Sequence, residues 1–493
     1  MHFSVYCLRT MAFVKNAIVM LFNSIEFTVF LPVVFILYWL LLKGNTARNV
    51  FIVIASYVFY GWWDVRFLLL IALTTICSYI SGMLIERYRG RWGAKATMWS
   101  NVLFNLGILV LFKYYGFFTR SLSELLAAFG ITLDAVTLDL ILPVGISFYT
   151  FQALSYTIDV YRGNIEPTRD IAAFFAFIAF FPQLVAGPIE RATSLLPQFL
   201  HRRHFDYATA VDGCRQILWG LFKKMAVADN CATAVNIIFS QYESLGGLTL
   251  LIGAILFSFQ IYGDFSGYSD IAIGVAKLFD IKLTRNFNLP YFSHNIREFW
   301  KRWHISLNRW FVDYLYVPLG GSRCNKSKIA RNSLVVFLAS GIWHGANWTF
   351  AAWGIYHAAL SMPYIIAGQR HDPVSHARRP VLYKLSMILS TFILVTIGWI
   401  LFRSNTIHDA LNYIYGIFSR FPTLDHVPWG RAIAWSAVLV IVECVQRKRR
   451  QPYEFPDMVI FRNRTVRWCI YYIMIIIIIG YSGNQADFIY FQF

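Results

Sequence analysis

The sequence predicts an all-α integral membrane protein that crosses the bilayer many times. Hydrophobic residues make up 57% of its 493 residues and charged residues only 14%, whereas soluble proteins carry about 25% charged residues. The apolar residues are gathered into runs separated by short polar loops, and a helix needs about 20 apolar residues to cross the hydrocarbon layer. These observations favour a polytopic protein with roughly 11–13 helices.

Eleven apolar segments are expected to form spans, and two further segments are ambiguous because they carry charged residues. The ambiguous segments are 211–239, which contains Lys223, Lys224 and Asp229, and 265–279, which contains Asp270. The eleven apolar segments are 27–42, 50–63, 67–85, 102–118, 138–160, 171–186, 248–262, 333–360, 387–402, 433–445 and 468–480.

Residues 20–493 are predicted to form a single transmembrane domain, since no linker or soluble stretch of domain size separates the apolar runs. Residues 1–19 fit this pattern less well. They contain Arg9 and Lys15 and have no small-residue cleavage site, so they make a poor signal peptide. We interpret them as an extension ahead of an internal start at Met20, and both Met1 and Met20 remain candidate starts.

The positive charge of the chain points to a membrane surface and not to nucleic acid. The formal net charge is +18, and its basic residues cluster in short loops at 86–91, 201–204 and 447–450. That placement follows the positive-inside rule and suits contact with anionic lipid head groups. The seven cysteines are scattered, and no pair has metal-ligand spacing. We therefore predict no bound metal, no bound cofactor and no nucleic-acid partner.

His304 lies in a segment that is rich in tryptophan and basic residues. Residues 297–316 predict one amphipathic helix, in which Trp303 shares a face with positions 307, 310 and 314, and His304 lies on the side of Asn308. Ionisable groups at membrane depth are costly and usually mark a function. The alternative, an interfacial histidine bonded to a backbone carbonyl, stays open.

His344 follows a clearly apolar run and is surrounded by small residues. Such residues permit close approach of a helix or a substrate, and Trp343 and Trp348 could form walls around the space. A neutral imidazole there can accept a proton from a hydroxyl, because its pKa lies near working pH. A helix–helix hydrogen bond is the alternative role. The small residues are Ala339, Gly341, Gly345 and Ala346.

Residues 258–270 place two carboxylates, Asp264 and Asp270, and several hydroxyls between apolar runs. A regular lipid-facing helix does not easily tolerate them, so we expect broken or re-entrant backbone that protein or water covers. In the alternative interpretation, either aspartate simply pairs with a cation such as Lys277 or Arg285.

Several motifs together resemble one family, the membrane-bound O-acyltransferases (MBOAT). The resemblance is strongest to the bacterial branch typified by the membrane subunit of alginate O-acetylation, with peptidoglycan O-acetylation and teichoic-acid D-alanylation proteins as relatives. It spans nearly the whole chain from Met20. The motifs are LPVGISFYTFQ at 142–152, FPQLVAGPI at 181–189, GDFSGYSD at 263–270, FWKRWHISL at 299–307, WHGANW at 343–348 and FIYFQF at 488–493.

This resemblance implies a ring of helices around a thin central pore in a bacterial cytoplasmic (inner) membrane. It implies that His344 is the catalytic histidine and His304 the second characteristic histidine. The acyl donor, acetyl-CoA or another acyl thioester, is expected on the cytoplasmic side. An extracytoplasmic partner of the SGNH-hydrolase type is expected to carry the group to a polysaccharide. We further expect substrate-binding or pore-lining roles for Asn308, Trp303, Trp343, Asn347, Asp264 and Asp270.

The leading hypothesis is therefore acyl transfer, with an acetyl group moving to an exopolysaccharide of the alginate kind or to a cell-wall glycan. D-alanyl transfer to teichoic acid is a related alternative. A transporter or flippase whose histidines relay protons is the rival from another class, and a scaffold that only recruits the partner is a third.

Overall fold

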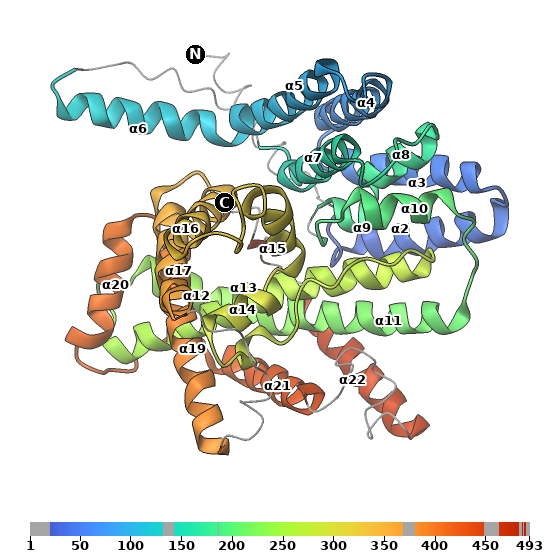
Figure 1. Cartoon of the computed structure of the whole chain (residues 1–493). Helices are drawn as coiled ribbons and strands as arrows, with labels where there is room; N and C mark the ends of the chain where they lie inside the picture. Colours follow the sequence, from blue (N-terminus) through green and yellow to red (C-terminus); the bar gives the residue numbers. More distant parts are fainter. Residues whose placement is uncertain are drawn as a thin grey trace, which may run out of the picture.

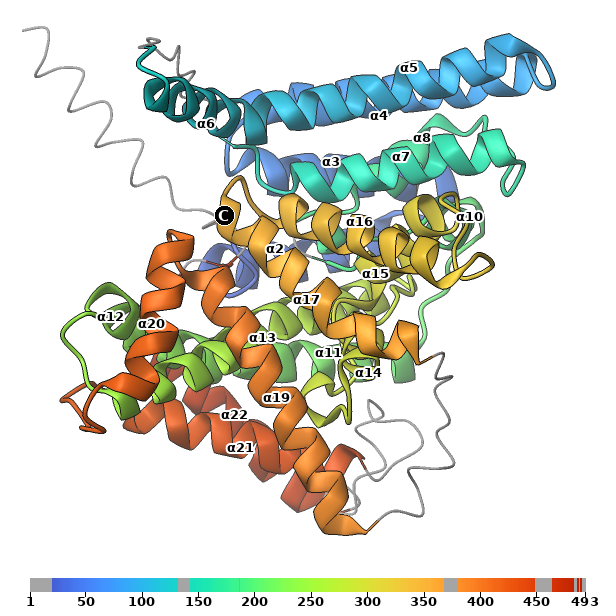
Figure 2. The same cartoon turned by 60° about the vertical axis from the view of Figure 1, so that its left-hand side comes forward.

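The computed structural model describes residues 20–131, 142–185, 187–367, 380–447, 463–482, 486 and 488–489, and every regular element within them is helical. The predicted all-α class is confirmed. Residues 1–19, which we interpreted as an extension, lie outside the described residues. Figures 1 and 2 show the helices stacked in layers, with the long pair α4 and α5 along one edge.

The N-terminal half of the chain contributes α2 to α10, and the C-terminal half contributes the remaining helices. The N-terminal elements are α2 (Ile25–Ile36), η1 (Leu37–Leu41), α3 (Asn45–Gly61), α4 (Arg66–Arg87), α5 (Trp92–Leu109), η2 (Val110–Tyr114), α6 (Tyr115–Ala128), α7 (Ile146–Arg162), α8 (Ile171–Ala179), α9 (Phe181–Leu184) and α10 (Ala192–Leu200).

The C-terminal half begins with a long helical run that changes to π-helix in its middle and ends with helices at the opposite edge. Its elements are α11 (Tyr207–Phe222), η3 (Lys223–Ala228), α12 (Asp229–Ser240), α13 (Gly247–Leu278), η4 (Pro290–Phe292), α14 (Ile296–Arg302), α15 (Ile305–Phe311), η5 (Val312–Tyr316), α16 (Lys326–His344), α17 (Trp348–Ile366), α19 (Val381–Arg403), α20 (Ile407–Ser419), α21 (Gly430–Arg447) and α22 (Arg464–Tyr481).

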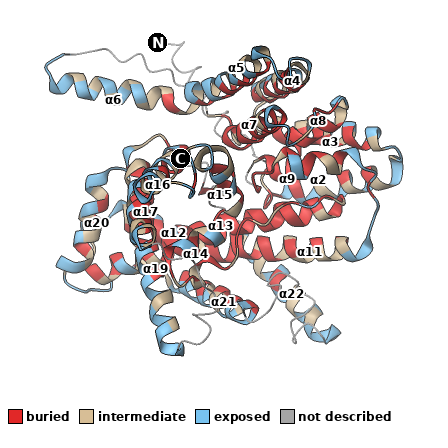
Figure 3. Cartoon of the chain, viewed as in Figure 1, coloured by how far each residue is buried: buried red, intermediate tan, exposed pale blue. Residues whose placement is uncertain are grey.

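Four helical stretches in the described residues are long and apolar enough to cross a membrane by themselves. They are Arg66–Arg87, Trp92–Ala128, Gly247–Leu278 and Val381–Arg403. Many other helices expose large apolar side chains, and Figure 3 shows exposed residues along the outer helices. The chain is therefore a multi-pass membrane protein, and the total of 11–13 crossings stays a prediction.

Helix α13 forms the centre of the molecule and is buried along most of its 32 residues. It packs against α11 at backbone distance, because glycines face each other across the contact. A Cβ on Gly220 would lie 2.6 Å from the carbonyl oxygen of Gly267, and one on Gly274 would lie 2.6 Å from that of Gly213. Close backbone approach of this kind is how membrane helices associate without large side chains.

The broken backbone that we expected at residues 258–270 is wrong, because α13 runs through them without interruption. Two lysines of η3 neutralise its carboxylates. The Nζ atom of Lys223 lies 2.5 Å from Asp270, and that of Lys224 lies 2.8 Å from Asp264 and 2.9 Å from Asp229. A regular helix can therefore carry these carboxylates in the core, because each has a buried cation beside it.

The alternative interpretation, that each of these aspartates pairs with a cation, is confirmed, but the cations are Lys223 and Lys224 and not the suggested Lys277 or Arg285. Lys277 pairs instead with Asp212, at 2.5 Å, and the head of Arg285 bonds to the carbonyl oxygen of Phe287 and the side chain of Asn288.

The single span predicted at 333–360 is in fact two helices, α16 and α17, which lie side by side (Figure 2). Helix α16 ends at His344, Gly345 is extended, and the side chain of Asn347 caps α17 by accepting from the amide of Thr349. The glycines permit the close contact between the two helices: a Cβ on Gly341 would lie 2.2 Å from the carbonyl oxygen of Phe350.

Candidate functional site

His344 is buried at the last position of α16 and has a fixed orientation. Its Nδ1 atom lies 2.6 Å from the carbonyl oxygen of Ser340, one turn earlier in the same helix. Its ring contacts the rings of Trp343, Trp353 and Phe402, with centroids 4.9, 5.2 and 5.4 Å away. A carbonyl oxygen can only accept, so Nδ1 carries the proton and Nε2 is the basic nitrogen of the neutral ring.

His304 is also buried, but the amphipathic helix predicted at 297–316 is wrong. The helix is interrupted between α14 and α15. His304 lies at this interruption with a φ of +43°, in the left-handed region. Residues 286–288 supply the hydrogen bonds that the broken helix lacks. The amide of Ile305 donates to the carbonyl of Asn286, and the amide of Asn288 donates to the carbonyl of Arg302.

Asn286 fixes the His304 side chain as well. Its Oδ1 atom lies 3.0 Å from Nδ1 of His304 and accepts from the hydroxyl of Ser306 at 2.9 Å. Asn286 is fully buried. The left-handed conformation is costly for a residue with a Cβ and persists only where the surroundings stabilise it, often at functional sites.

The two histidines are brought together across one indole ring. The Trp343 ring lies 6.0 Å from the His304 ring and 4.9 Å from the His344 ring, centroid to centroid. Residues 304 and 344 are far apart in the sequence, and only the tertiary fold places both next to Trp343.

Two cavities lie at successive positions along α16. The large cavity, about 850 Å³, touches the helix from Ile329 to Ser340 and is bordered by the α14 and α15 region, including Trp300 and Asn308. Three exposed basic residues are among those that line it, namely Arg297, Lys301 and Arg309.

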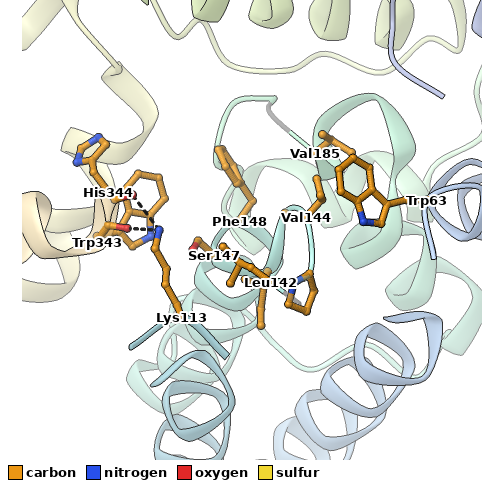
Figure 4. Close-up of a pocket in the computed structure, with 12 residues that line it drawn as sticks. Trp63, Lys113, Leu142, Val144, Ser147, Phe148, Val185, Trp343 and His344 are labelled. Carbon is orange, nitrogen blue, oxygen red and sulfur yellow. Dashed lines mark hydrogen bonds between the residues drawn. The ribbon is translucent and has the colours of Figure 1, made fainter. Parts of the chain in front are cut away.

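The small cavity, about 90 Å³, is lined by Trp343, His344 and the adjacent Lys113, and across from them by the start of α7 (Figure 4). Ser340, whose carbonyl holds His344, therefore borders the large cavity, and His344 itself borders the small one.

The other predicted site residues divide into two groups. Trp343 lines the small cavity and Asn308 the large one, and the Asn308 amide donates to the carbonyls of Trp300 and Trp303. Trp303 lines neither cavity: it is buried and packs on Trp399, with centroids 4.8 Å apart.

Asn347, Asp264 and Asp270 likewise border neither cavity. Asn347 is a helix cap whose amide donates to the carbonyl of Asn405, and Asp264 and Asp270 form the ion pairs described above. Trp348, suggested as a wall, is 57% exposed and lies against Phe117 instead. Within the described residues no group of three or more histidines, cysteines and carboxylates could hold a metal ion.

Sequence reasoning missed two residues at this site, Asn286 and Lys113. Asn286 carries no sequence signal, since a single asparagine in a connecting segment is common. Lys113 did carry one: it is a charged residue inside the predicted span 102–118, and the cost of an intramembrane charge would have selected it in the same way as the histidines.

Comparison with known proteins identifies the family. The family model for MBOAT, the membrane-bound O-acyltransferase family, matches residues 1–402. The probable alginate O-acetylase AlgI of Pseudomonas aeruginosa is 42% identical over 403 residues, covering 81% of this chain and 75% of the relative. The peptidoglycan O-acetyltransferase of Helicobacter pylori is 34% identical over 438 residues, covering 82% and 81%.

A more distant relative is the teichoic acid D-alanyltransferase of Bacillus subtilis, which is 27% identical over 277 residues, covering 54% of this chain and 69% of the relative. The resemblance inferred from the motifs is confirmed. The chain is an acyltransferase of the membrane, and it belongs to the membrane-bound O-acyltransferase family.

Proposed function

We propose that this protein moves an acetyl group from acetyl-CoA in the cytoplasm towards the hydroxyls of an extracytoplasmic polysaccharide, with His344 as the general base. The observation that carries the proposal is that His344 lines the small cavity while its Nδ1 is held by the carbonyl of Ser340, a residue that lines the large cavity. The names of the relatives, which are O-acetylases and O-acetyltransferases of glycans, support the acetyl group and the polysaccharide.

The chemistry needs no covalent intermediate on the protein. Nε2 of His344 takes the proton of the acceptor hydroxyl while that oxygen attacks the thioester carbonyl. The carbon–sulfur bond then breaks, and the proton passes from the imidazole to the leaving thiolate. The products are an acetyl ester and free CoA thiol, so atoms and charge balance. His304, oriented by Asn286, helps to position the donor or the acceptor beside Trp343.

The charge around the large cavity supports its assignment to the donor. Arg297, Lys301 and Arg309 are among the residues that line it, and phosphate groups such as those of CoA are commonly bound by such residues. The positive-inside rule also favours a cytoplasmic location for this basic end. The membrane would then be the bacterial inner membrane, with the small cavity directed towards the other side.

The size of the small cavity supports the need for a partner. At about 90 Å³ it holds only a few water molecules and cannot admit a polysaccharide chain in this conformation. An extracytoplasmic transferase of the SGNH-hydrolase type could supply the hydroxyl that reaches His344 and then acetylate the glycan.

The test uses purified full-length protein, with any co-purifying partner, and acetyl-CoA labelled in the acetyl group. We expect release of free CoA thiol and transfer of label to partner or glycan, both abolished in His344→Ala. Label transfer that persists undiminished in His344→Ala would show that His344 is not the general base. Proton-coupled solute uptake by vesicles without thioester consumption would favour the transporter.

A further inference from the structure

Lys113 is a charged residue inside an apolar helical stretch, and its ammonium group has no carboxylate partner in the described part of the chain. It lies in the π-helical segment η2, within the candidate span Trp92–Ala128. Among the described residues no carboxylate lies within ion-pair distance of it. A charge at membrane depth is costly, and π-helical segments occur frequently at functional sites. A lysine at this position is therefore expected to have a specific role that offsets the cost of its charge.

The ammonium group is occupied by the end of the helix that carries His344. Its Nζ atom lies 2.8 Å from the carbonyl oxygen of Trp343 and 2.9 Å from that of His344, as the dashed lines in Figure 4 mark. It also lies 5.9 Å from the centroid of the Trp343 ring. The next residue assists, because the hydroxyl of Tyr114 donates to the carbonyl of Ile342 at 2.9 Å.

These carbonyls need a donor from outside their helix. The last four carbonyls of any α-helix have no partner within it, and a glycine in the left-handed region often supplies a backbone amide. Gly345 is extended instead, with a φ of −166°. A lysine charge at this position also offsets the negative end of the helix dipole.

We infer that Lys113 is a positioning residue for the acyl transfer: it caps the C-terminal end of α16 and thereby holds His344 in its catalytic orientation. The Nδ1 bond of His344 runs to Ser340, within the same last turn that Lys113 holds together. If that turn frays, the imidazole loses both its place beside the small cavity and the bond that fixes its tautomer. The inference rests on the proposed role of His344 as base.

The small cavity makes this role accessible to experiment. Lys113 lines it, so a small amine can reach the space left when the side chain is shortened. The experiment compares wild type, Lys113→Ala, Lys113→Arg and Lys95→Met in thioester turnover with acetyl-CoA. Lys95 is the matched control, because it is an exposed lysine on the same continuous helical stretch.

We expect Lys113→Ala to lower kcat on the order of tenfold to a hundredfold, since small displacements of a catalytic group have effects of that size. KM for acetyl-CoA should stay unchanged, because the large cavity does not include Lys113. Ethylammonium added to Lys113→Ala should restore much of kcat, Lys113→Arg should retain part of it, and Lys95→Met should match wild type.

Four results separate this inference from the proposed function. A wild-type protein without thioester turnover, or a His344→Ala variant with full turnover, contradicts the proposed function. Wild-type kcat in a folded Lys113→Ala variant contradicts the inference alone. A loss of kcat in Lys113→Ala that no amine restores, together with a changed KM and a lower unfolding temperature, would mean that Lys113 has only a structural role. That result would also overturn the inference.

Discussion

Nδ1 of His344 lies 2.6 Å from the carbonyl oxygen of Ser340. This one contact decides which nitrogen can act as a base, because the carbonyl can only accept and so holds the proton on Nδ1. The same residue, Ser340, borders the large cavity, while His344 borders the small one. The end of α16 is thus where a donor and an acceptor from different sides would meet.

Replacing His344 by Gln should abolish most acyl transfer while leaving the fold intact. A positioned general base typically contributes about 10²- to 10⁴-fold, so thioester turnover should fall by that order. The measurement is the release of free CoA thiol by purified protein. His408→Gln is the control, because His408 is exposed on α20, and it should keep wild-type turnover. If His408→Gln lost as much turnover as His344→Gln, the loss would not be specific to His344.

Replacing Asn286 by Ala should both destabilise the protein and slow transfer. The variant removes the acceptor for Nδ1 of His304 and for the Ser306 hydroxyl, and buried polar groups left without a partner cost about 1–3 kcal/mol each. Titration with SDS in mixed micelles measures the unfolding free energy. Unchanged stability and turnover would mean that His304 does not depend on Asn286.

Replacing Lys224 by Met should be severe, because it leaves Asp229 and Asp264 buried without their cation. Loss of one partner of a buried ion pair typically costs about 3–5 kcal/mol. Lys277→Met is the matched control: the Lys277–Asp212 pair is about one quarter exposed, and such pairs contribute roughly 0–1 kcal/mol. Equal losses of unfolding free energy in the two variants would contradict the distinction.

Replacing Gly341 by Ala should separate α16 from α17 and disturb the site. Its Cβ would lie 2.2 Å from the backbone oxygen of Phe350, and overpacking costs about 1–3 kcal/mol. Gly107→Ala on α5 has no atom within 4 Å of the new Cβ and should instead stabilise by roughly 0.5–1 kcal/mol. Thermal unfolding in detergent measures both, and a neutral Gly341→Ala would show that the helices can move apart freely.

Replacing Arg297, Lys301 and Arg309 together by Ala should raise KM for acetyl-CoA roughly tenfold, because each exposed charge contact contributes on the order of 0.2–1 kcal/mol. KM for a truncated acetyl thioester without phosphates should not change. Arg66→Ala is the control, since that arginine is exposed and pairs with Asp64. Equal rises in KM for both thioesters would show that the three residues do not bind the phosphates of CoA.

The sequence predicted His304 and His344 because a charge-bearing ring at membrane depth stands out against an apolar background. It predicted one helix at 297–316 because the apolar residues repeat with helical period. That helix fails at His304 because the hydrogen bonds of Asn286 and Asn288 replace those within the helix. Local periodicity cannot reveal this exchange of hydrogen bonds, since the partner residues lie in a separate segment.

Composition and periodicity alone determined that this is a helical membrane protein, and the motifs determined its family. Only the tertiary structure decided that the carboxylates of α13 belong to ion pairs with Lys223 and Lys224, and that Lys113 caps the helix of His344. The physical reason is the same in both cases. The cost of a buried charge is local and visible in the sequence, whereas the partner that compensates it comes from another helix and is fixed only by packing.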